Sequence, residues 1–289
     1  MIDAGVERAE KPWDLEFGSK TEIFDLHLRD IWSYRYLLFL FVKRDFVAQY
    51  KQTILGPFWH LLQPIITSVI FMLVFGAVAR IPTEGVPPML FYLSGITLWN
   101  YFAACFTHTS NTFVANASIF GKVYFPRLIM PISVVVSNVI RLIIQGVLLF
   151  GVMVYYHYNG FSLYFGGKTA IIPLLIIMMA GIGLGLGIIV SSLTTKYRDL
   201  AILVSFGVQL LMYATPIIYP LSFVRGTKYE NIVKYNPLTG VVENFKAALF
   251  GINPVNYTSL GYSAIFMIVV LAIGMLLFNK VEKSFMDTI

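Results

Sequence analysis

Three cations, Lys43, Arg44 and Lys51, precede the first long apolar run of the chain and lie close to Leu55 and Gly56. Lysine and arginine bind phosphate groups through charge-assisted hydrogen bonds. Backbone amides exposed beside a glycine add further donors. The segment is therefore a candidate site for an anionic headgroup. The alternative is that these cations contact ordinary lipid headgroups and reflect only the excess of positive charge on the cytoplasmic side of membrane proteins.

Arg141 is the one charged residue between Arg127 and Lys168, and it lies deep within an apolar run. A cation at that depth is costly, so its side chain is expected to face protein, water or an anionic ligand. Two interpretations stay open at this point. Arg141 either pairs with a polar neighbour, such as Asn138 or Gln145, or lines a conduction path.

Residue patterns for catalysis or metal binding are not found. The run Gly166-Gly167-Lys168-Thr169 resembles part of a nucleotide-binding loop, but Ser162 stands where that loop requires its first glycine. No paired carboxylates stand at ligand spacing from the four dispersed histidines, His27, His60, His108 and His157. We therefore predict no catalytic residue and no metal site. Any ATP would be handled by another polypeptide.

The composition is typical of an integral membrane protein. Hydrophobic residues make up 57% of the chain and charged residues 12%, whereas soluble domains carry about 25% charged residues. The charges cluster between long runs, each long enough for a spanning helix of about 20 apolar residues. These runs lack the alternation of barrel strands. We predict an all-α fold with six membrane helices, near residues 59–79, 90–113, 128–155, 169–193, 200–219 and 259–279.

Loop charge predicts the orientation of these spans. With six spans, the side that holds both termini carries 14 Lys and Arg residues, and the other side carries 6. Because positive charge accumulates on the cytoplasmic side, both termini are predicted to be cytoplasmic. Residues 1–30 lack the apolar core of a cleavable signal peptide. The single Cys105 excludes an intrachain disulfide. The net charge of +6 is attributed to juxtamembrane cations rather than to nucleic-acid binding.

Two segments outside the spans carry further patterns. Residues 1–24 are a polar N-terminal segment, and residues 25–289 form the membrane domain. Within it, charged and aromatic residues interleave over 25–53, which favours an amphipathic helix at the cytoplasmic interface; a soluble helix packed on a partner is the alternative. Prolines and a half-apolar run over 215–254 favour an external re-entrant helical hairpin between spans five and six. An external loop with one surface helix is the alternative.

Four glycines alternate along the fourth predicted span, at Gly181, Gly183, Gly185 and Gly187. They form two pairs with small residues four positions apart. In membrane helices such pairs allow neighbouring backbones to approach closely. We therefore expect span four to pack tightly against other helices.

Short strings occur in order along residues 25–289 and carry a family resemblance. They are Lys43-Arg44-Asp45, Tyr50-Lys51-Gln52-Thr53, Leu55-Gly56-Pro57-Phe58-Trp59 and Leu62-Gln63-Pro64 at the first span, Val123-Tyr124-Phe125-Pro126-Arg127 after the second, Lys196-Tyr197-Arg198-Asp199 after the fourth, and Thr215-Pro216-Ile217-Ile218-Tyr219 and Tyr235-Asn236-Pro237-Leu238 around the predicted hairpin. Their order, combined with six spans, resembles the permeases of polysaccharide ABC exporters, the type-2 ABC export family.

The resemblance implies the transmembrane subunit of an ATP-driven exporter in the bacterial inner membrane. Its cargo would be a lipid-linked polysaccharide of the O-antigen kind, with capsule or teichoic acid as the alternative. It implies a homodimer with two separate ABC ATPase subunits, which bind ATP and Mg. It also implies that a polyprenyl diphosphate enters near Leu55 and Gly56. The loop between spans two and three would dock on the ATPase, with Asn111, Asn116 and Lys122 as its coupling residues.

A pore for a polar polymer is expected to present aromatic and hydrogen-bonding groups. Candidate residues for this path are Trp59, Arg141, Tyr213 and Tyr219. Two other classes of protein fit less well. A secondary transporter would need intramembrane carboxylates or an inverted repeat, and the predicted spans hold neither. A membrane enzyme acting on a lipid-linked sugar would need clustered Asp, Glu or His at a membrane edge.

Overall fold

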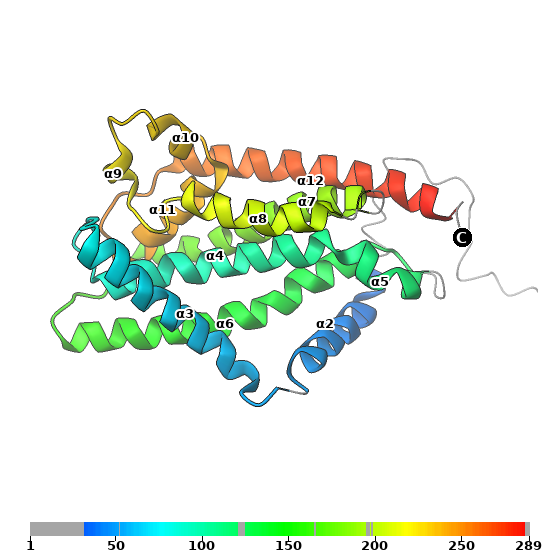
Figure 1. Ribbon diagram of the computed structural model, residues 1–289, viewed down its shortest axis with the longest axis horizontal. Coiled ribbons are helices and arrows are strands. Elements are labelled where there is room, and N and C mark those ends of the chain that lie inside the picture. Colours follow the sequence, from blue (N-terminus) through cyan, green and yellow to red (C-terminus); the bar gives the residue numbers. More distant parts are fainter. Residues whose placement is uncertain are drawn as a thin grey trace, which may run out of the picture.

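The computed structural model describes residues 32–51, 53–120, 125–164, 166–194, 197 and 199–286, and its regular structure over these ranges is helical (Figure 1). Five helices are long and apolar enough to cross a membrane. They are Gly56–Val78, Pro88–Ser110, Ile129–Tyr158, Gly167–Thr194 and Tyr257–Val281. They match five of the six predicted spans, which confirms that this is a multi-pass membrane protein.

The described elements follow the chain in a simple order. The first span combines η1 (Gly56–Phe58), α3 (Trp59–Phe71) and the π-helical η2 (Met72–Val78), and it is preceded by α2 (Arg35–Tyr50). The remaining elements are α4 (Pro88–Ser110), α5 (Thr112–Phe120), α6 (Ile129–Tyr158), η3 (Gly167–Ile171), α7 (Ile172–Thr194), α8 (Leu200–Tyr213), α9 (Leu221–Val224), α10 (Glu230–Lys234), α11 (Pro237–Phe250) and α12 (Tyr257–Met286).

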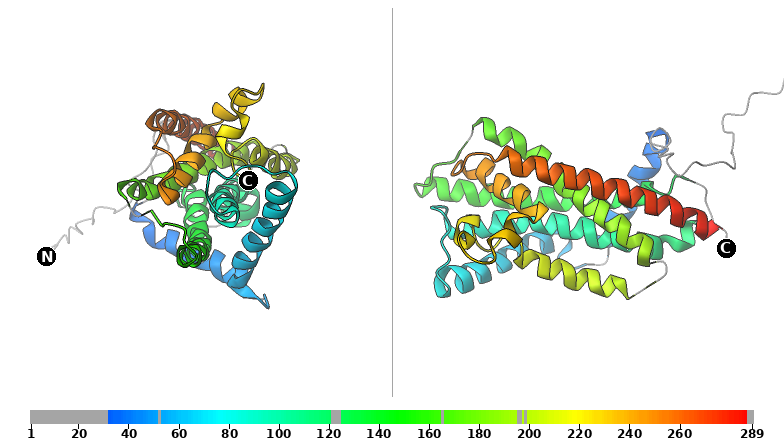
Figure 2. Two further views of the ribbon diagram at one scale, coloured as in Figure 1. Left: turned by 90° about the vertical axis from the view of Figure 1, so that its left-hand side faces the viewer. Right: turned by 90° about the horizontal axis from the view of Figure 1, so that it is seen from above.

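Helices α4 and α7 form the centre of the bundle. Most of α4 is buried, and the view along the long axis shows it enclosed by other helices (Figure 2). A Cβ atom added at Gly187 would lie 2.5 Å from Cβ of Thr109 in α4, and one at Gly185 would lie 2.9 Å from Cγ1 of Val270 in α12. Alternate glycines therefore bring α7 against α4 on one side and α12 on the other. The predicted close packing of span four is confirmed.

The fifth predicted span is not one continuous helix. Helix α8 has 14 residues and ends at Tyr213, whereas the sequence prediction continued the helix to residue 219. Thr215 precedes Pro216, and a residue before proline is disfavoured in the helical conformation. The hydroxyl of Thr215 donates to the carbonyl oxygen of Leu211 at 2.8 Å, within the last turn. Residues 215–218 are non-helical and buried.

Helix α11 has clear local start and stop signals. The side chain of Asn236 accepts a hydrogen bond from the backbone N–H of Leu238 at 3.0 Å, and Pro237 occupies the first turn. The helix ends at Gly251, whose φ of 70° lies in the left-handed region that favours glycine. Most of α11 is buried against α12, α7 and α4. Helix α11 is therefore packed within the helix bundle.

Helix α2 lies at the end of the bundle that also holds α5 and the C-terminal part of α12 (Figure 1, Figure 2). It packs against α6, and Phe41 is buried with its ring 5.7 Å from that of Phe125. Tyr36 and Phe39 of α2 are exposed, as is Trp32 just before the helix. The location of this helix at the membrane interface stays a prediction. Residues 1–31, which include the polar segment 1–24 and the start of the predicted helix 25–53, lie outside the described residues.

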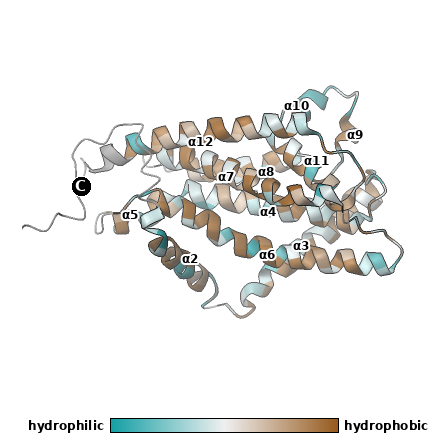
Figure 3. Cartoon of the chain, turned by 180° about the vertical axis from the view of Figure 1, so that it is seen from behind, coloured by the Kyte–Doolittle hydropathy of each residue, from teal (hydrophilic) through white to brown (hydrophobic). Residues whose placement is uncertain are grey.

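The distribution of hydrophobic and hydrophilic residues agrees with a bundle of membrane helices. Hydrophobic residues cover the long helices, and hydrophilic residues gather on α2 and α10, at opposite ends of the bundle (Figure 3). The loop that follows η2 and the loop that follows α6 lie at the end with α9, α10 and α11 (Figure 1). The elements predicted to be cytoplasmic and those predicted to be external thus separate to the two ends.

Candidate functional site

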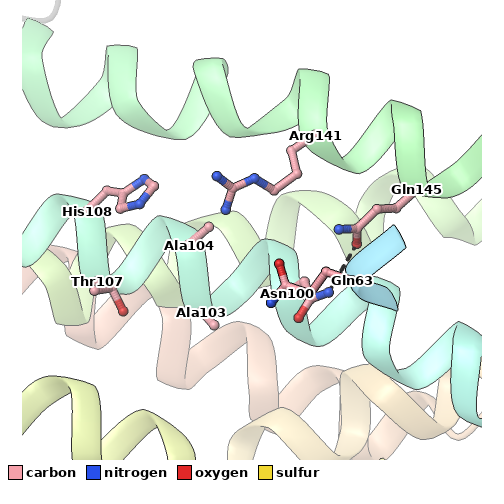
Figure 4. A pocket seen from close by; sticks show the side chains of 8 residues that line it. All are labelled: Gln63, Asn100, Ala103, Ala104, Thr107, His108, Arg141 and Gln145. Atoms are coloured by element: carbon pink, nitrogen blue, oxygen red, sulfur yellow. Dashed lines mark hydrogen bonds between the residues drawn. The ribbon is translucent and has the colours of Figure 1, made fainter. Parts of the chain in front are cut away.

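A polar cavity lies between three apolar helices, α3, α4 and α6. Its volume is about 250 Å³. Its lining residues are Gln63 from α3, Asn100, Ala103, Ala104, Thr107 and His108 from α4, and Arg141 and Gln145 from α6 (Figure 4). We refer to it as the arginine cavity. The described residues that line it include no carboxylate, so the fixed charge among them is the positive one of Arg141.

Arg141 extends from α6 toward α4, between His108 and Asn100 (Figure 4). Its Nε atom is buried without a hydrogen-bond partner. The neighbours predicted to pair with it bond elsewhere. Asn138 donates to the carbonyl oxygen of Val134 at 2.8 Å, and Gln145 accepts from Asn100 at 3.4 Å. Of the two interpretations left open by the sequence, the pairing of Arg141 with Asn138 or Gln145 is not seen, and the guanidinium faces the cavity.

A second cavity of about 600 Å³ adjoins the first and lies between α2, α5 and α6. His108 lines both cavities, and its Nδ1 atom lies 3.4 Å from Nδ2 of Asn138. We refer to the second one as the amide cavity, because four carboxamides and three hydroxyls contribute to its lining. They belong to Gln49, Asn111, Asn116 and Asn138, and to Thr112, Ser133 and Ser137.

Helix spacing explains how these side chains meet. Residues three or four apart share a helix face. In α6 this places Asn138, Arg141 and Gln145 on one face, and in α4 it places Asn100 on the face that carries His108. Sequence analysis did not single out the α4 residues. The polar members of that face, recurring at helical spacing within an apolar run, could have indicated them.

Of the predicted headgroup residues, Arg44 is the one that lines a cavity. It forms an ion pair with Asp45 at 2.8 Å and donates to Oδ1 of Asn116 at 3.4 Å, at the edge of the amide cavity. Lys43 and Lys51 are exposed. Arg44 is exposed as well, but its contacts with Asp45 and Asn116 hold it in a network at the edge of the amide cavity.

Leu55 and Gly56 form the turn into the first span. Gly56 has a φ of 50°, which favours glycine, and nothing lies within 4 Å of the position that a Cβ would occupy. His60 lies one turn further on. Its Nε2 atom is 3.4 Å from the Nε2 atom of Gln49, and its ring packs edge-on against the ring of Tyr50. Burial raises the pKa of Tyr50, so its phenol stays neutral. These contacts connect the start of α3 to α2.

The four residues predicted to line a conduction path are not brought together. Arg141 lies in the arginine cavity, and Trp59 is half-exposed at the start of α3. Tyr213 and Tyr219 meet at the end of α8, where the Tyr219 hydroxyl donates to the backbone carbonyl of Tyr213 at 2.8 Å. They stabilise the break after α8.

The predicted coupling residues follow α4. Asn111 donates to the carbonyl oxygen of Thr107 at 3.3 Å, and Asn116 donates to that of Thr112 at 3.0 Å. Both amides thus make contacts within the protein. Lys122, the third predicted coupling residue, lies outside the described residues.

The sequence matches the family described as "ABC-2 type transporter" over residues 36–250. The O-antigen export system permease protein RfbA of Klebsiella pneumoniae is 28% identical over 253 residues, which cover 87% of this chain and 94% of that protein. The protein of the same name from Myxococcus xanthus is 25% identical over 77% of this chain and 84% of its own length. The polysialic acid transport protein KpsM of Escherichia coli is 23% identical over 85% of this chain and 93% of its own length.

Proposed function

This chain belongs to the ABC-2 type transporter family, and we propose that it is the transmembrane subunit of an ATP-driven exporter that carries a lipid-linked polysaccharide out of the bacterial cytoplasm. The observation that carries the proposal is the cation Arg141, which is partly buried within an apolar helix bundle and faces a polar cavity there. Such a residue marks a path for a polar or anionic substrate. The names of the similar proteins favour an O-antigen, and a capsular polymer is the second candidate.

The source of energy is proposed to be a separate ABC ATPase that binds ATP and Mg. Two ATPase subunits would lie beneath a homodimer of this chain. Groups of three or more His, Cys, Asp or Glu side chains that could hold a metal ion are absent from the described residues. The five described spans contain no Asp or Glu, and the charge deep within them is the cation Arg141. Transport coupled to ions through intramembrane carboxylates therefore has no support in these spans, which favours an ATP-driven permease over a secondary transporter.

The topology is proposed to have six spans in the inner membrane, with cytoplasmic termini. Helix α8, continued by residues 214–219, would be the sixth crossing. Helices α9, α10 and α11 would form an external re-entrant unit, which the burial of α11 supports. Backbone that is irregular at membrane depth must find its hydrogen bonds within protein. Asn236 meets this need by donating to the carbonyl oxygen of Ala214 at 3.0 Å.

The entry route is proposed to begin at α2. The exposed Lys43 and Lys51 would attract the diphosphate of the lipid carrier electrostatically, and Arg44 would lead it toward the amide cavity. Leu55 and Gly56 form the adjacent turn at the membrane surface. The exposed aromatic side chains of Trp32 and Tyr36 suit the headgroup region, where amphipathic rings are enriched.

The proposal is tested by deleting the gene in its own bacterium and measuring surface polysaccharide. We expect loss of surface polymer and accumulation of the lipid-linked polymer inside the cell. Re-expression of the chain should restore export when the ATPase partner has an intact nucleotide site, and fail when that site is inactivated. Unchanged surface polymer in the deletion strain would contradict the proposal. The identity of the accumulated polymer separates O-antigen from capsule.

A further inference from the structure

We propose that the two adjoining cavities form one binding site for the junction between the diphosphate and the first sugars of the substrate. The arginine cavity takes the diphosphate, and the amide cavity takes the sugars. This inference rests on the proposed function, and it assigns a ligand chemistry to each cavity.

The arginine cavity fits an anion. Arg141 is partly buried, and a guanidinium withdrawn from water favours a counter-charge. The described residues that line this cavity include no carboxylate. The Nε atom of Arg141 is buried with its hydrogen-bonding capacity unused. Guanidinium groups bind phosphate oxygens in a bidentate manner, which a compact ammonium does not reproduce. Gln63 and Thr107 line the same cavity and offer further donors. A diphosphate matches this set of groups.

The amide cavity fits neutral, polar groups instead. Its cation, Arg44, is neutralised by Asp45 at 2.8 Å. Its carboxamides and hydroxyls both donate and accept hydrogen bonds, as the hydroxyls of sugars do. The Oγ atom of Ser137 is buried without a partner. At about 600 Å³ the cavity is larger than the arginine cavity. These features favour a sugar over a second anion.

The arrangement of the cavities fixes the order of the ligand's parts. His108 lines both, so one ligand can occupy the two without crossing another element. The amide cavity is bordered by α2 and α5, which lie at the end of the bundle with the C-terminal part of α12 (Figure 1). The arginine cavity is bordered by α3, α4 and α6, and its lining in α4 runs from Asn100 to His108, further from the end at which α4 meets α5. The diphosphate therefore lies deeper than the sugars.

The test measures binding to the detergent-purified complex of this chain with its ATPase. Three probes are used: farnesyl diphosphate, farnesol, and farnesyl diphosphate carrying one N-acetylglucosamine. Arg141→Gln should weaken both diphosphate probes by roughly 10- to 100-fold, the effect of losing hydrogen bonds to a charged group, and leave farnesol binding unchanged. The control Arg80→Gln removes an exposed cation at the opposite end of the bundle and should change nothing.

The sugar half of the site is tested with Ser137→Val, which adds apolar volume where the hydroxyl has no internal partner. It should weaken the sugar-bearing probe several-fold and leave farnesyl diphosphate unaffected. Equal binding of farnesyl diphosphate to wild type and Arg141→Gln overturns the proposal, as does an equal loss of both diphosphate probes in Ser137→Val. If Arg141→Gln does not fold, as judged by size-exclusion chromatography, Arg141→Lys replaces it and should bind with intermediate affinity.

The experiments distinguish failure of this site assignment from failure of the proposed function. If the wild-type chain restores surface polymer in the deletion strain but Arg141→Gln binds diphosphate normally, only the site assignment fails. If the wild-type chain does not restore export, the proposed function fails, whatever the probes show.

Discussion

The ammonium group of Lys246 lies 2.7 Å from the carbonyl oxygen of Pro216, although the two residues belong to α11 and to the buried segment after α8. The same Nζ atom lies 3.7 Å from the centre of the Phe91 ring in α4. A fully buried lysine is stable only when its donors are satisfied. Lys246 therefore connects three elements at the end of the bundle that holds α9 and α10, and it satisfies backbone that the break after α8 leaves unpaired.

Replacing Lys246 by methionine keeps the length of the side chain and removes its hydrogen bonds. Loss of the partner of a buried carbonyl should cost about 1–3 kcal/mol. We expect a lower unfolding temperature in detergent and faster proteolysis between residues 214 and 236. The control is Lys228→Met, which replaces an exposed lysine in the loop between α9 and α10. Its unfolding temperature and protease sensitivity should equal those of the wild type. Equal protease sensitivity of the two variants would show that Lys246 does not hold this segment.

The glycines of α7 give a second prediction. Gly187→Val would force side-chain atoms into Thr109, whose Cβ lies 2.5 Å from the position of an added Cβ. The two helices would have to separate, and overpacking of this kind costs about 1–3 kcal/mol. We expect less folded protein by fluorescence-detected size exclusion. Gly146→Val in α6, where no atom lies within 4 Å of the added Cβ, is the matched control. Normal yield of Gly187→Val would contradict the close packing.

The sequence predicts the spans well because length and hydropathy are sufficient to identify a membrane helix. Five predicted spans agree with the structure within a few residues. The prediction for the fifth span, residues 200–219, ends too late, because the apolar run continues past Tyr213 while the helix ends before Pro216. Hydropathy does not register that break. Its stabilisation by Lys246 and Asn236 depends on contacts with residues far along the chain.

The candidate site is only partly visible in the sequence. Arg141 stands out as a charge in an apolar run, and its spacing to Asn138 and Gln145 is plain. Whether it pairs with them depends on rotamers and on partners in α4. Asn100 and His108 bond to those amides instead, so the guanidinium faces the cavity. Sequence spacing does not provide this information.

The proposed orientation predicts a labelling pattern. Single cysteines replacing Glu84 and Lys168 should react with an impermeant thiol reagent added from outside, because both loops lie at the predicted external end. Cysteines replacing Lys122 and Tyr197 should react only after the membrane is opened. The native Cys105 is buried and should stay unlabelled in intact cells. Labelling at position 197 from outside would reverse the topology.

The cations at α2 are predicted to contribute unequally to export. Arg44 belongs to a network at the amide cavity, so Arg44→Gln should lower polymer export about tenfold, as expected for loss of a hydrogen bond to a charged group. Lys51 is exposed, and Lys51→Gln should lower export by about two- to threefold. Export is measured as surface polymer at matched expression, with Lys228→Gln, an exposed lysine at the opposite end of the bundle, as the control. Full export in both variants would remove α2 from the entry route.

Coupling to the ATPase is predicted to depend on the segment that follows α5. Helix α5 lies at the same end as α2, and Asn116 connects the two through Arg44 at 3.4 Å. A force on this segment would therefore reach the edge of the amide cavity directly. Lys122→Glu should lower both transport and transport-stimulated ATP hydrolysis, while Lys168→Glu at the opposite end should change neither.

Asn116→Ala distinguishes docking on the ATPase from transmission of movement between α5 and α2. It removes the hydrogen bond to Arg44 without changing the charge of the segment. ATPase association, measured by co-purification, should therefore stay normal while transport per ATP hydrolysed falls. Lys122→Glu should instead weaken the association itself, because reversing a charge at an interface costs affinity. If association and transport are both unchanged in Lys122→Glu, the segment does not dock on the ATPase, and the contact between Arg44 and Asn116 serves only to stabilise α2.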